Sequence, residues 1–282
     1  MNYLILNGKL LPADQASIYH TNRAFRYGDG VFESMMVWNG HPYLLDLHLT
    51  RIQEAAAALK INFRETLNEK YFRGQIQQLI EANHFKNARV RLVVYRSGGG
   101  YYAPDQNESE YLLEATEVQN DFYIWHDKGL NIGLYNELKK PRNFLSPYKT
   151  CNSLLYVMAS KFKEENNFDE CLILNEPGRV CELISSNLFM VKRGVLITTA
   201  ASEAPILGVM RRHIIDIALK NQLEVAERSI RLDELVEGDE LFTTNIAGGI
   251  RWIHNFYGKE YKHNVSFLMY EMLKNEKIKN HK

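Results

Sequence analysis

The sequence has little cysteine and no excess charge of either sign. Its three cysteines form no CxxC pair and no disulfide framework, which fits the reducing cytoplasm that we expect for this chain. The nine histidines and the cysteines show no metal-ligand spacing, so we predict no metal site. Lys plus Arg and Asp plus Glu both number 34, and this balance gives no reason to expect a nucleic acid or an anionic membrane as partner.

Long apolar runs are absent as well. No stretch approaches the roughly 18–20 apolar residues of a membrane-spanning helix. The first residues lack the basic and apolar regions of a signal peptide, so no secretion signal is expected. What is present is a globular composition, with 45% hydrophobic and 24% charged residues in a chain of 282. That length allows one large domain or two of ordinary size.

The hydrophobic pattern of residues 1–118 predicts a small α+β domain. Apolar residues at helical spacing indicate a helix at about 46–60, with Asp46 as its N-cap. A second helix at about 66–83 opens with a capping box of Thr66 and Glu69. Strands are expected on either side of the turns at Asn7-Gly8 and Asn39-Gly40, and then at 90–95 and 111–118.

A polar stretch at 119–128 is the predicted linker, and residues 129–282 form the predicted second, larger domain. Short strands follow one another closely there, so we expect a strand-rich core and a mixed α+β and α/β fold. The expected helices lie at 152–165, 208–221, 232–236 and 265–277. The expected strands lie at 130–135, 170–174, 187–191, 195–199, 223–230, 240–244 and 249–255.

Lys149 stands at a junction between a loop and a helix. It follows Ser146-Pro147-Tyr148 and precedes the helix predicted from about Asn152. Partial desolvation at such a junction makes a lysine amine nucleophilic. A solvated surface lysine is the structural alternative, since lysine is mostly an exposed residue.

Three further segments have the residues of a ring-binding or anion-binding site. Glu182 lies between apolar stretches, and a carboxylate buried there needs a partner such as a ring nitrogen. Gly208 opens a predicted helix, whose first N–H groups and dipole attract phosphate. Residues 243–249 offer hydroxyls, an amide and backbone groups at the end of a strand. The alternatives are an exposed strand end, an ordinary helix start and a plain turn.

The order and spacing of these segments resemble the class IV aminotransferases, the fold-type-IV enzymes that use pyridoxal 5′-phosphate. The resemblance extends from about residue 3 to 255. It rests on six runs in the family's order: 27–33 (YGDGVFE), His48-x-x-Arg51, Lys149-x-x-Asn152, Glu182 to Phe189, 208–211 (GVMR), and 239–242 (DELF) followed by 244–246 (TNI). The family includes branched-chain aminotransferases, D-amino-acid aminotransferases and 4-amino-4-deoxychorismate lyases. Its two-domain fold is the one expected here.

The resemblance also implies roles for individual residues. Lys149 would form the Schiff base with the cofactor and then act as the general base. Arg51 and the N–H groups near Met210 and Ile246 would hold the phosphate, and ionised Glu182 would pair with the pyridine nitrogen. The implied cofactor-binding residues are Arg51, Lys149, Glu182, Ile206, Val209, Met210, Asn245 and Ile246, with Ile206 packing against the ring.

Within the family the sequence favours the lyase. Met210 stands where transaminases commonly carry threonine, and Asn245-Ile246 replaces their hydroxyl residues. The loop at 97–102 (SGGGYY) also resembles the glycine-rich loop of the lyases. The first prediction is therefore 4-amino-4-deoxychorismate lyase of the folate pathway, which releases p-aminobenzoate and pyruvate.

Two features favour transamination instead. Gly100 stands where the lyase loop often carries an arginine, so one carboxylate anchor is missing. Arg91 falls where branched-chain aminotransferases place an arginine near the substrate carboxylate, although a surface ion pair is its alternative. Phe32 and Tyr102 are further candidate substrate contacts. Branched-chain transamination ranks second, and D-amino-acid transamination ranks third because the Arg-x-His pair that traps its substrate carboxylate is absent from this loop.

A cofactor carrier without turnover is the remaining alternative. Lys149 and Glu182 argue against it, since both are more than cofactor binding demands. The family likeness further implies a homodimer that takes a small amino substrate, with its active sites near the subunit interface. Tyr101 or Tyr102 would reach across that interface.

Overall fold

The computed structural model describes residues 2–280, which divide into two compact units. The first unit takes the chain up to Phe122 together with Tyr148–Asn152. The second unit takes Tyr123–Pro147 and the chain from Ser153 onward. The segment that carries Lys149 therefore belongs to the first unit, although residues of the second unit precede and follow it. The domain boundaries expected from the sequence stay a prediction.

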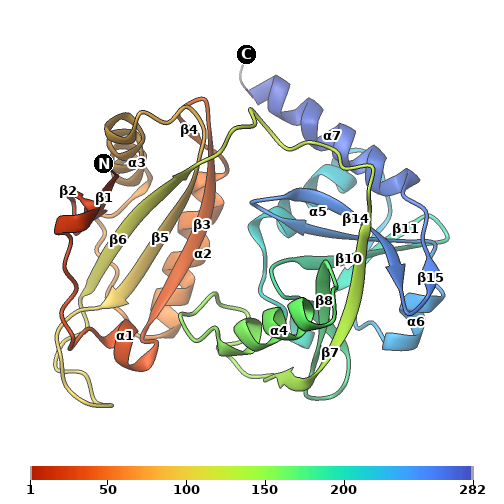
Figure 1. The fold of residues 1–282 in the computed structure, drawn as a ribbon, viewed down its shortest axis with the longest axis horizontal. Helices are drawn as coiled ribbons and strands as arrows, with labels where there is room; N and C mark the ends of the chain where they lie inside the picture. The colour runs from red at the N-terminus through yellow and green to blue at the C-terminus, as the bar shows by residue number, and fades with distance from the viewer. Residues whose placement is uncertain (1, 281–282) are drawn as a thin grey trace. The chain divides into compact units, whose positions relative to one another are not determined.

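A six-stranded antiparallel sheet organises the first unit, in the order β2-β1-β6-β5-β3-β4 (Figure 1). The strands are β1 (Tyr3–Leu6), β2 (Lys9–Pro12), β3 (Gly30–Trp38), β4 (His41–Pro42), β5 (Ala88–Arg96) and β6 (Ser109–Glu117). The helices are α1 (Arg23–Tyr27), α2 (Leu45–Ala58) and α3 (Glu69–Asn83), with a 3-10 turn at Ala13–Gln15.

The core of this unit follows from the alternation of apolar residues along the strands. Val90, Leu92 and Val94 alternate along β5 and are fully buried. They form one cluster with apolar residues of α2 and α3, such as Ile52 and Ile76. Side chains two residues apart point to the same face of a strand, so this alternation gives the sheet one face for the helices to cover.

Two predicted helix caps were wrong. Asp46 lies in the first turn of α2 rather than at its N-cap. The N-cap of α3 is Asn68, whose side chain accepts a hydrogen bond from the backbone N–H of Tyr71, so Thr66 does not open a capping box. The N-cap of α2 is Leu44, which has a left-handed backbone and no side chain that caps the helix. At α3, Thr66 and Asn68 are both residues that can cap, and the local sequence does not decide which of them leaves helical geometry.

A nine-stranded mixed sheet organises the second unit, in the order β12-β11-β10-β13-β14-β7-β8-β9, with β15 beside β14. Its strands are β7 (Leu130–Lys140), β8 (Glu170–Asn175), β9 (Val180–Leu183), β10 (Asn187–Lys192), β11 (Val195–Thr199), β12 (Val225–Arg228), β13 (Glu240–Asn245), β14 (Gly249–Phe256) and β15 (Lys259–Glu260). Its helices are α4 (Leu154–Glu165), α5 (Val209–Lys220), α6 (Leu232–Val236) and α7 (Asn264–Asn280), with a 3-10 turn at Ala201–Glu203.

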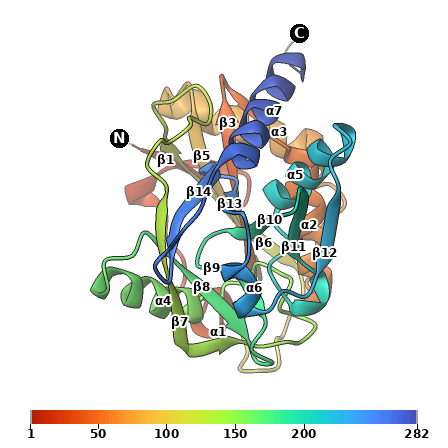
Figure 2. The same cartoon turned by 90° about the vertical axis from the view of Figure 1, so that its right-hand side faces the viewer.

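Helices α5 and α7 pack against each other and against β13, and α7 also packs against β14 (Figure 2). The strands β8, β9 and β10 are buried over nearly their whole length, which agrees with the expected strand-rich core. Among residues 2–280, no helix is both long enough and apolar enough to cross a membrane.

Candidate functional site

Lys149 lies in a short extended segment beside β3 of the first unit. The N–H of Phe32 donates to the carbonyl of Lys149 at 2.9 Å, and the N–H of Cys151 donates to the carbonyl of Gly30 at 2.9 Å. Val31 and Thr150 form an antiparallel bridge between the two segments. The backbone around Lys149 is therefore held on both sides by the first residues of β3.

The side chains of Lys149 and Arg91 both lie against the ring of Phe32. Its Nζ lies 4.2 Å from the centroid of the Phe32 ring, and the Arg91 Cζ lies 3.9 Å from the same centroid. Arg91 also pairs with Glu114 on β6, where Nε and Oε1 are 3.6 Å apart. The first unit thus brings together three predicted site residues, Phe32, Arg91 and Lys149. The surface ion pair considered for Arg91 is present as well.

Two of the sequence runs meet at Gly28. Asn152 Nδ2 donates to the carbonyl of Gly28 at 3.1 Å. Gly28 has φ of +66°, and a Cβ at this position would press against the Asn152 side chain. Both facts require glycine. The lysine segment and the 27–33 run are therefore fitted to each other.

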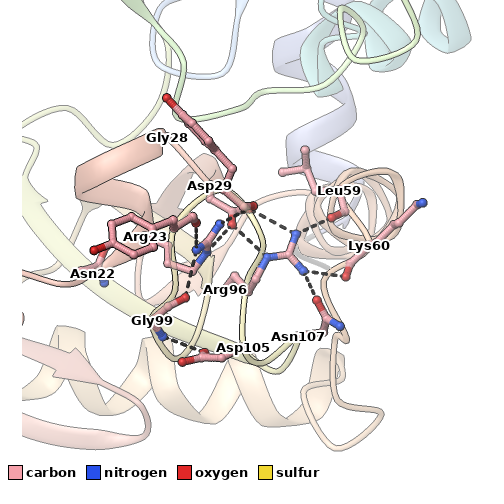
Figure 3. A network of polar contacts seen from close by, with 12 residues as sticks. Asn22, Arg23, Gly28, Asp29, Leu59, Lys60, Arg96, Gly99, Asp105 and Asn107 are labelled. Carbon is pink, nitrogen blue, oxygen red and sulfur yellow. Dashed lines mark hydrogen bonds and ion pairs between the residues drawn. The ribbon is translucent and has the colours of Figure 1, made fainter.

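Asp29 joins two buried arginines that the sequence analysis did not single out (Figure 3). Arg23 Nε donates to Asp29 Oδ2 at 2.7 Å, and Arg96 Nε donates to the same oxygen at 2.9 Å. Burial alone would raise the pKa of Asp29, but hydrogen bonds from Arg96 and Arg23 lower it. Arg23 Nη1 also donates to the carbonyls of Gly99 and Tyr101, at 2.9 and 2.6 Å. The glycine-rich loop is thereby tied to the 27–33 run.

Tyr102, a predicted substrate contact, lies at the tip of this loop. Its side chain is 89% exposed, and its ring centroid lies 5.6 Å from that of Tyr27. Tyr102 therefore has a ring contact with Tyr27 but leaves most of its side chain exposed to solvent.

Arg51 is bound by a carboxylate that the sequence analysis left without a role. Its Nε and Nη2 donate to the two oxygens of Glu33, each at 2.6 Å. His48 Nδ1 lies 2.7 Å from Glu33 Oε2. Burial alone would raise the pKa of Glu33, but the Arg51 charge and the His48 hydrogen bond lower it to about 2. A signal was present, because a His48-Arg51 pair on a buried helix face needs an anion.

Glu182 is buried in β9 of the second unit, so the alternative of an exposed strand end was wrong. Its Oε1 accepts hydrogen bonds from Lys140 Nζ and, at 2.7 Å, from the Tyr156 hydroxyl. Its Oε2 accepts from the backbone N–H of Ile206 at 2.8 Å. Burial and the Glu182 charge raise the pKa of Tyr156, so this phenol stays a donor. Lys140 and Tyr156 are site residues that sequence reasoning missed.

The turn that leads into α5 is built on Asn187. The Asn187 Nδ2 donates to the Ile206 carbonyl at 2.7 Å. A Cβ on Gly208 would overlap Asn187 Oδ1, so this turn requires glycine for space. Gly208 is the N-cap of α5, and no side chain caps the helix. The first N–H groups of a helix of this length bind anions well, and they belong to Val209 and Met210.

The predicted second phosphate loop lies beside this turn. Strand pairing sets Asn187 opposite Thr244, the penultimate residue of β13. The buried Thr244 hydroxyl has no hydrogen-bond partner among the described residues. Gly248 N–H donates to Asn245 Oδ1 at 2.6 Å, and the Tyr123 hydroxyl donates to the Ile246 carbonyl at 2.7 Å. The predicted contact residues Asn245 and Ile246 are thus held in a tight turn.

These residues of the second unit fit pyridoxal phosphate. Glu182 offers a fixed anion to a ring N–H, the start of α5 offers N–H groups to a phosphate, and Thr244 offers an unpaired hydroxyl. Ile206 connects the parts, since its N–H binds Glu182 and its carbonyl binds Asn187. Within residues 2–280, no three His, Cys, Asp or Glu side chains converge as a metal site.

Comparison with known proteins agrees with this arrangement. The sequence profile of the family described as amino-transferase class IV matches residues 30–256. The D-alanine aminotransferase of Listeria monocytogenes is 28% identical over 247 residues, which cover 86% of this chain and 83% of that protein.

Solved structures of the same family share the fold. The branched-chain amino acid aminotransferase of Escherichia coli superposes with a TM-score of 0.85 at 20% identity, covering 96% of this chain and 92% of that one. The 4-amino-4-deoxychorismate lyase of Pseudomonas aeruginosa gives a TM-score of 0.84 at 24% identity, covering 96% and 98%. At these identities the likeness shows the fold alone. It confirms the expected fold-type-IV architecture.

Proposed function

Since this chain belongs to the class IV aminotransferase family and is therefore a pyridoxal-phosphate-dependent enzyme, we propose that it is a 4-amino-4-deoxychorismate lyase. The proposed reaction splits 4-amino-4-deoxychorismate into p-aminobenzoate and pyruvate. Branched-chain transamination is the second candidate. Fold does not decide between them, because the reactions share one scaffold.

The residues at the two phosphate turns carry the preference for the lyase. Met210, the second residue of α5, is buried, and Asn245 uses its side-chain oxygen within its own turn. Neither side chain offers a hydroxyl, whereas hydroxyl residues are typical of the family's transaminases at these positions.

Pyridoxal phosphate, when bound, supplies a ring that withdraws electrons from the substrate Cα. Lys149 is the base, whose Nζ takes the Cα proton and returns a proton at another atom. Glu182 would accept a hydrogen bond from the ring N–H of the cofactor. Arg51, the first N–H groups of α5 and the 244–248 turn would hold its phosphate. Anchoring at several points fixes the orientation of the reacting bond.

One residue of the first unit is suited to either candidate reaction. Arg91 lies against Phe32, the ring that Lys149 also contacts. A guanidinium there can bind a substrate carboxylate in a forked geometry. Both candidate reactions use carboxylate substrates, so Arg91 contributes to either one.

The test supplies the cofactor-loaded protein with 4-amino-4-deoxychorismate made in place by a partner synthase. Release of p-aminobenzoate and pyruvate is followed for the wild type and for Lys149→Ala, with Lys161→Ala as the matched control. Lys161 is an exposed lysine that pairs with Glu164 on α4. We expect release from the wild type and from Lys161→Ala, and loss of turnover in Lys149→Ala.

Protein that keeps the visible absorbance of bound cofactor but releases no p-aminobenzoate would contradict the lyase. Branched-chain amino acids with 2-oxoglutarate are then the next substrates. Turnover by Lys149→Ala equal to that of the wild type would contradict the role of Lys149. A protein that binds the cofactor and turns over neither substrate class would be tested with D-amino acids next, and failure there would leave the carrier alternative.

A further inference from the structure

Glu182 is already paired with a cation inside its own unit. The Lys140 ammonium binds Glu182 Oε1, and the two side chains are 5% and 4% exposed. Desolvating two charges is unfavourable, and close pairing only partly repays that penalty. The burial of both charges therefore needs a reason beyond the stability that the ion pair contributes.

The path of β7 turns Lys140 toward Glu182. Up to Tyr135 the strand pairs regularly with β8, where Tyr135 lies opposite Ile173. The register then shifts, and the next partners are Lys140 and Asn175. Residues 136–139 are exposed, whereas Lys140 is buried again. Extra residues in one strand redirect the following side chain, so this irregularity places the ammonium at Glu182.

The carboxylate retains room for one further donor. A carboxylate offers about four lone-pair positions. Lys140 and Tyr156 bind Oε1, while Ile206 is the one donor among the described residues that is bonded to Oε2. A ring N–H would bind at Oε2. The charge of Glu182 is balanced by Lys140 before any such ring arrives.

We propose that Lys140 is the resident counter-ion of Glu182. It is a positioning residue that neutralises this carboxylate and holds its orientation while the cofactor is absent. In the loaded protein the ring N–H becomes a second positive partner of the same carboxylate. This second step rests on the proposed function, because it assigns Glu182 to the ring nitrogen.

The first measurement uses cofactor-free protein. The midpoint of thermal unfolding is compared for the wild type, Lys140→Met and the double variant Lys140→Met/Glu182→Gln. Lys139→Met is the matched control, since Lys139 is the exposed neighbour on β7. We expect a lower midpoint for Lys140→Met, partial recovery in the double variant, and no change for Lys139→Met.

The second measurement adds pyridoxal phosphate. The rise in midpoint should be larger for Lys140→Met than for the wild type, because the ring nitrogen replaces the missing cation. The double variant should show no such extra rise. An equal or smaller rise in Lys140→Met would overturn the proposal for the loaded protein.

The two parts fail separately. If the wild type shows neither a midpoint rise nor visible absorbance with the cofactor, the proposed function fails, but the cofactor-free comparison still decides the ion pair. If Lys140→Met does not fold and the double variant does, the counter-ion is supported. If the midpoint of the double variant is no higher than that of Lys140→Met, or if both variants fail to fold, Lys140 does not act as the counter-ion of Glu182.

Discussion

Charged residues within the first unit are held by partners distant in sequence. Glu33 on β3 is 1% exposed and binds Arg51 and His48 from α2. Removing one partner of a buried ion pair leaves an uncompensated charge, which destabilises more than the pair stabilises. The orientation of Arg51 therefore depends on Glu33, and the predicted phosphate contact depends on both.

Glu33→Gln is expected to destabilise the protein in a pH-dependent way. The pKa of Glu33 falls from its ordinary value of 4.5 to about 2 on folding, so its ionised form contributes stability above pH 4.5 and loses it as the pH falls to about 2. That difference corresponds to about 3 kcal/mol. Urea unfolding of both proteins between pH 7 and 2 should show a gap that closes at low pH. A gap independent of pH would contradict the expectation.

Arg91→Gln is expected to raise the KM for the amino substrate by about tenfold to a hundredfold, since a charged hydrogen bond is worth roughly 1.5–3 kcal/mol. Arg89→Gln is the matched control, because Arg89 is an exposed arginine on the same strand. Steady-state kinetics of the three proteins check the prediction. Equal KM values for both variants would remove Arg91 from the substrate site.

At the scale of elements, short turns and helix ends decide where the site residues stand. The turn before α5 rests on Asn187, and the 97–102 loop rests on Arg23. Both supports are side chains on neighbouring elements. Turns of this kind keep their shape only while those side chains fill the space beneath them.

Gly208→Ala is expected to weaken cofactor binding by about tenfold or more, because the added methyl overlaps Asn187 and shifts the start of α5. Gly74→Ala is the control. A Cβ on Gly74 would meet nothing within 4 Å, and alanine within α3 should add up to about 1 kcal/mol of stability. Titration with pyridoxal phosphate measures the cofactor affinity of both variants. Unchanged affinity in Gly208→Ala would show that the turn can adjust.

Arg23→Met is expected to loosen the glycine-rich loop without unfolding the sheet. The variant loses the donors to Asp29, Gly99 and Tyr101. Amide hydrogen exchange should accelerate in residues 99–105 and stay unchanged in the buried centre of β5. Arg26→Met serves for comparison, since Arg26 is exposed and donates to the His20 carbonyl. Equal exchange rates in the loop of both variants would contradict the role of the Arg23 hydrogen bonds in holding the loop.

At the scale of the whole molecule, the family likeness implies a homodimer, and the exposed loop rings suit such an interface. Tyr101 and Tyr102 are 83% and 89% exposed. Tyr102→Glu is expected to shift sedimentation from dimer toward monomer and to lower activity, while Tyr257→Glu, at a ring 62% exposed, should change neither. A wild type that sediments as a monomer would contradict the dimer.

Much of this protein was determined by the sequence itself. The six ordered runs indicated the family and its cofactor, and hydrophobic periodicity located the long helices and most strands. The short elements α1 and β9 were not predicted, because runs of five and four residues show little periodicity, although the equally short α6 was located. Both caps were misplaced by two residues, since the N-cap of α2 is Leu44, which does not cap through its side chain, and Asn68 rather than Thr66 caps α3.

Only the tertiary structure decided which groups neutralise the buried charges. Glu33 and Arg51 stand 18 residues apart, and Lys140 and Glu182 stand 42 apart. Periodicity and capping are local properties, so they carry no information about partners at such separations. Strand register and the irregularity of β7 bring those groups together, and burial then makes each charge depend on its partner.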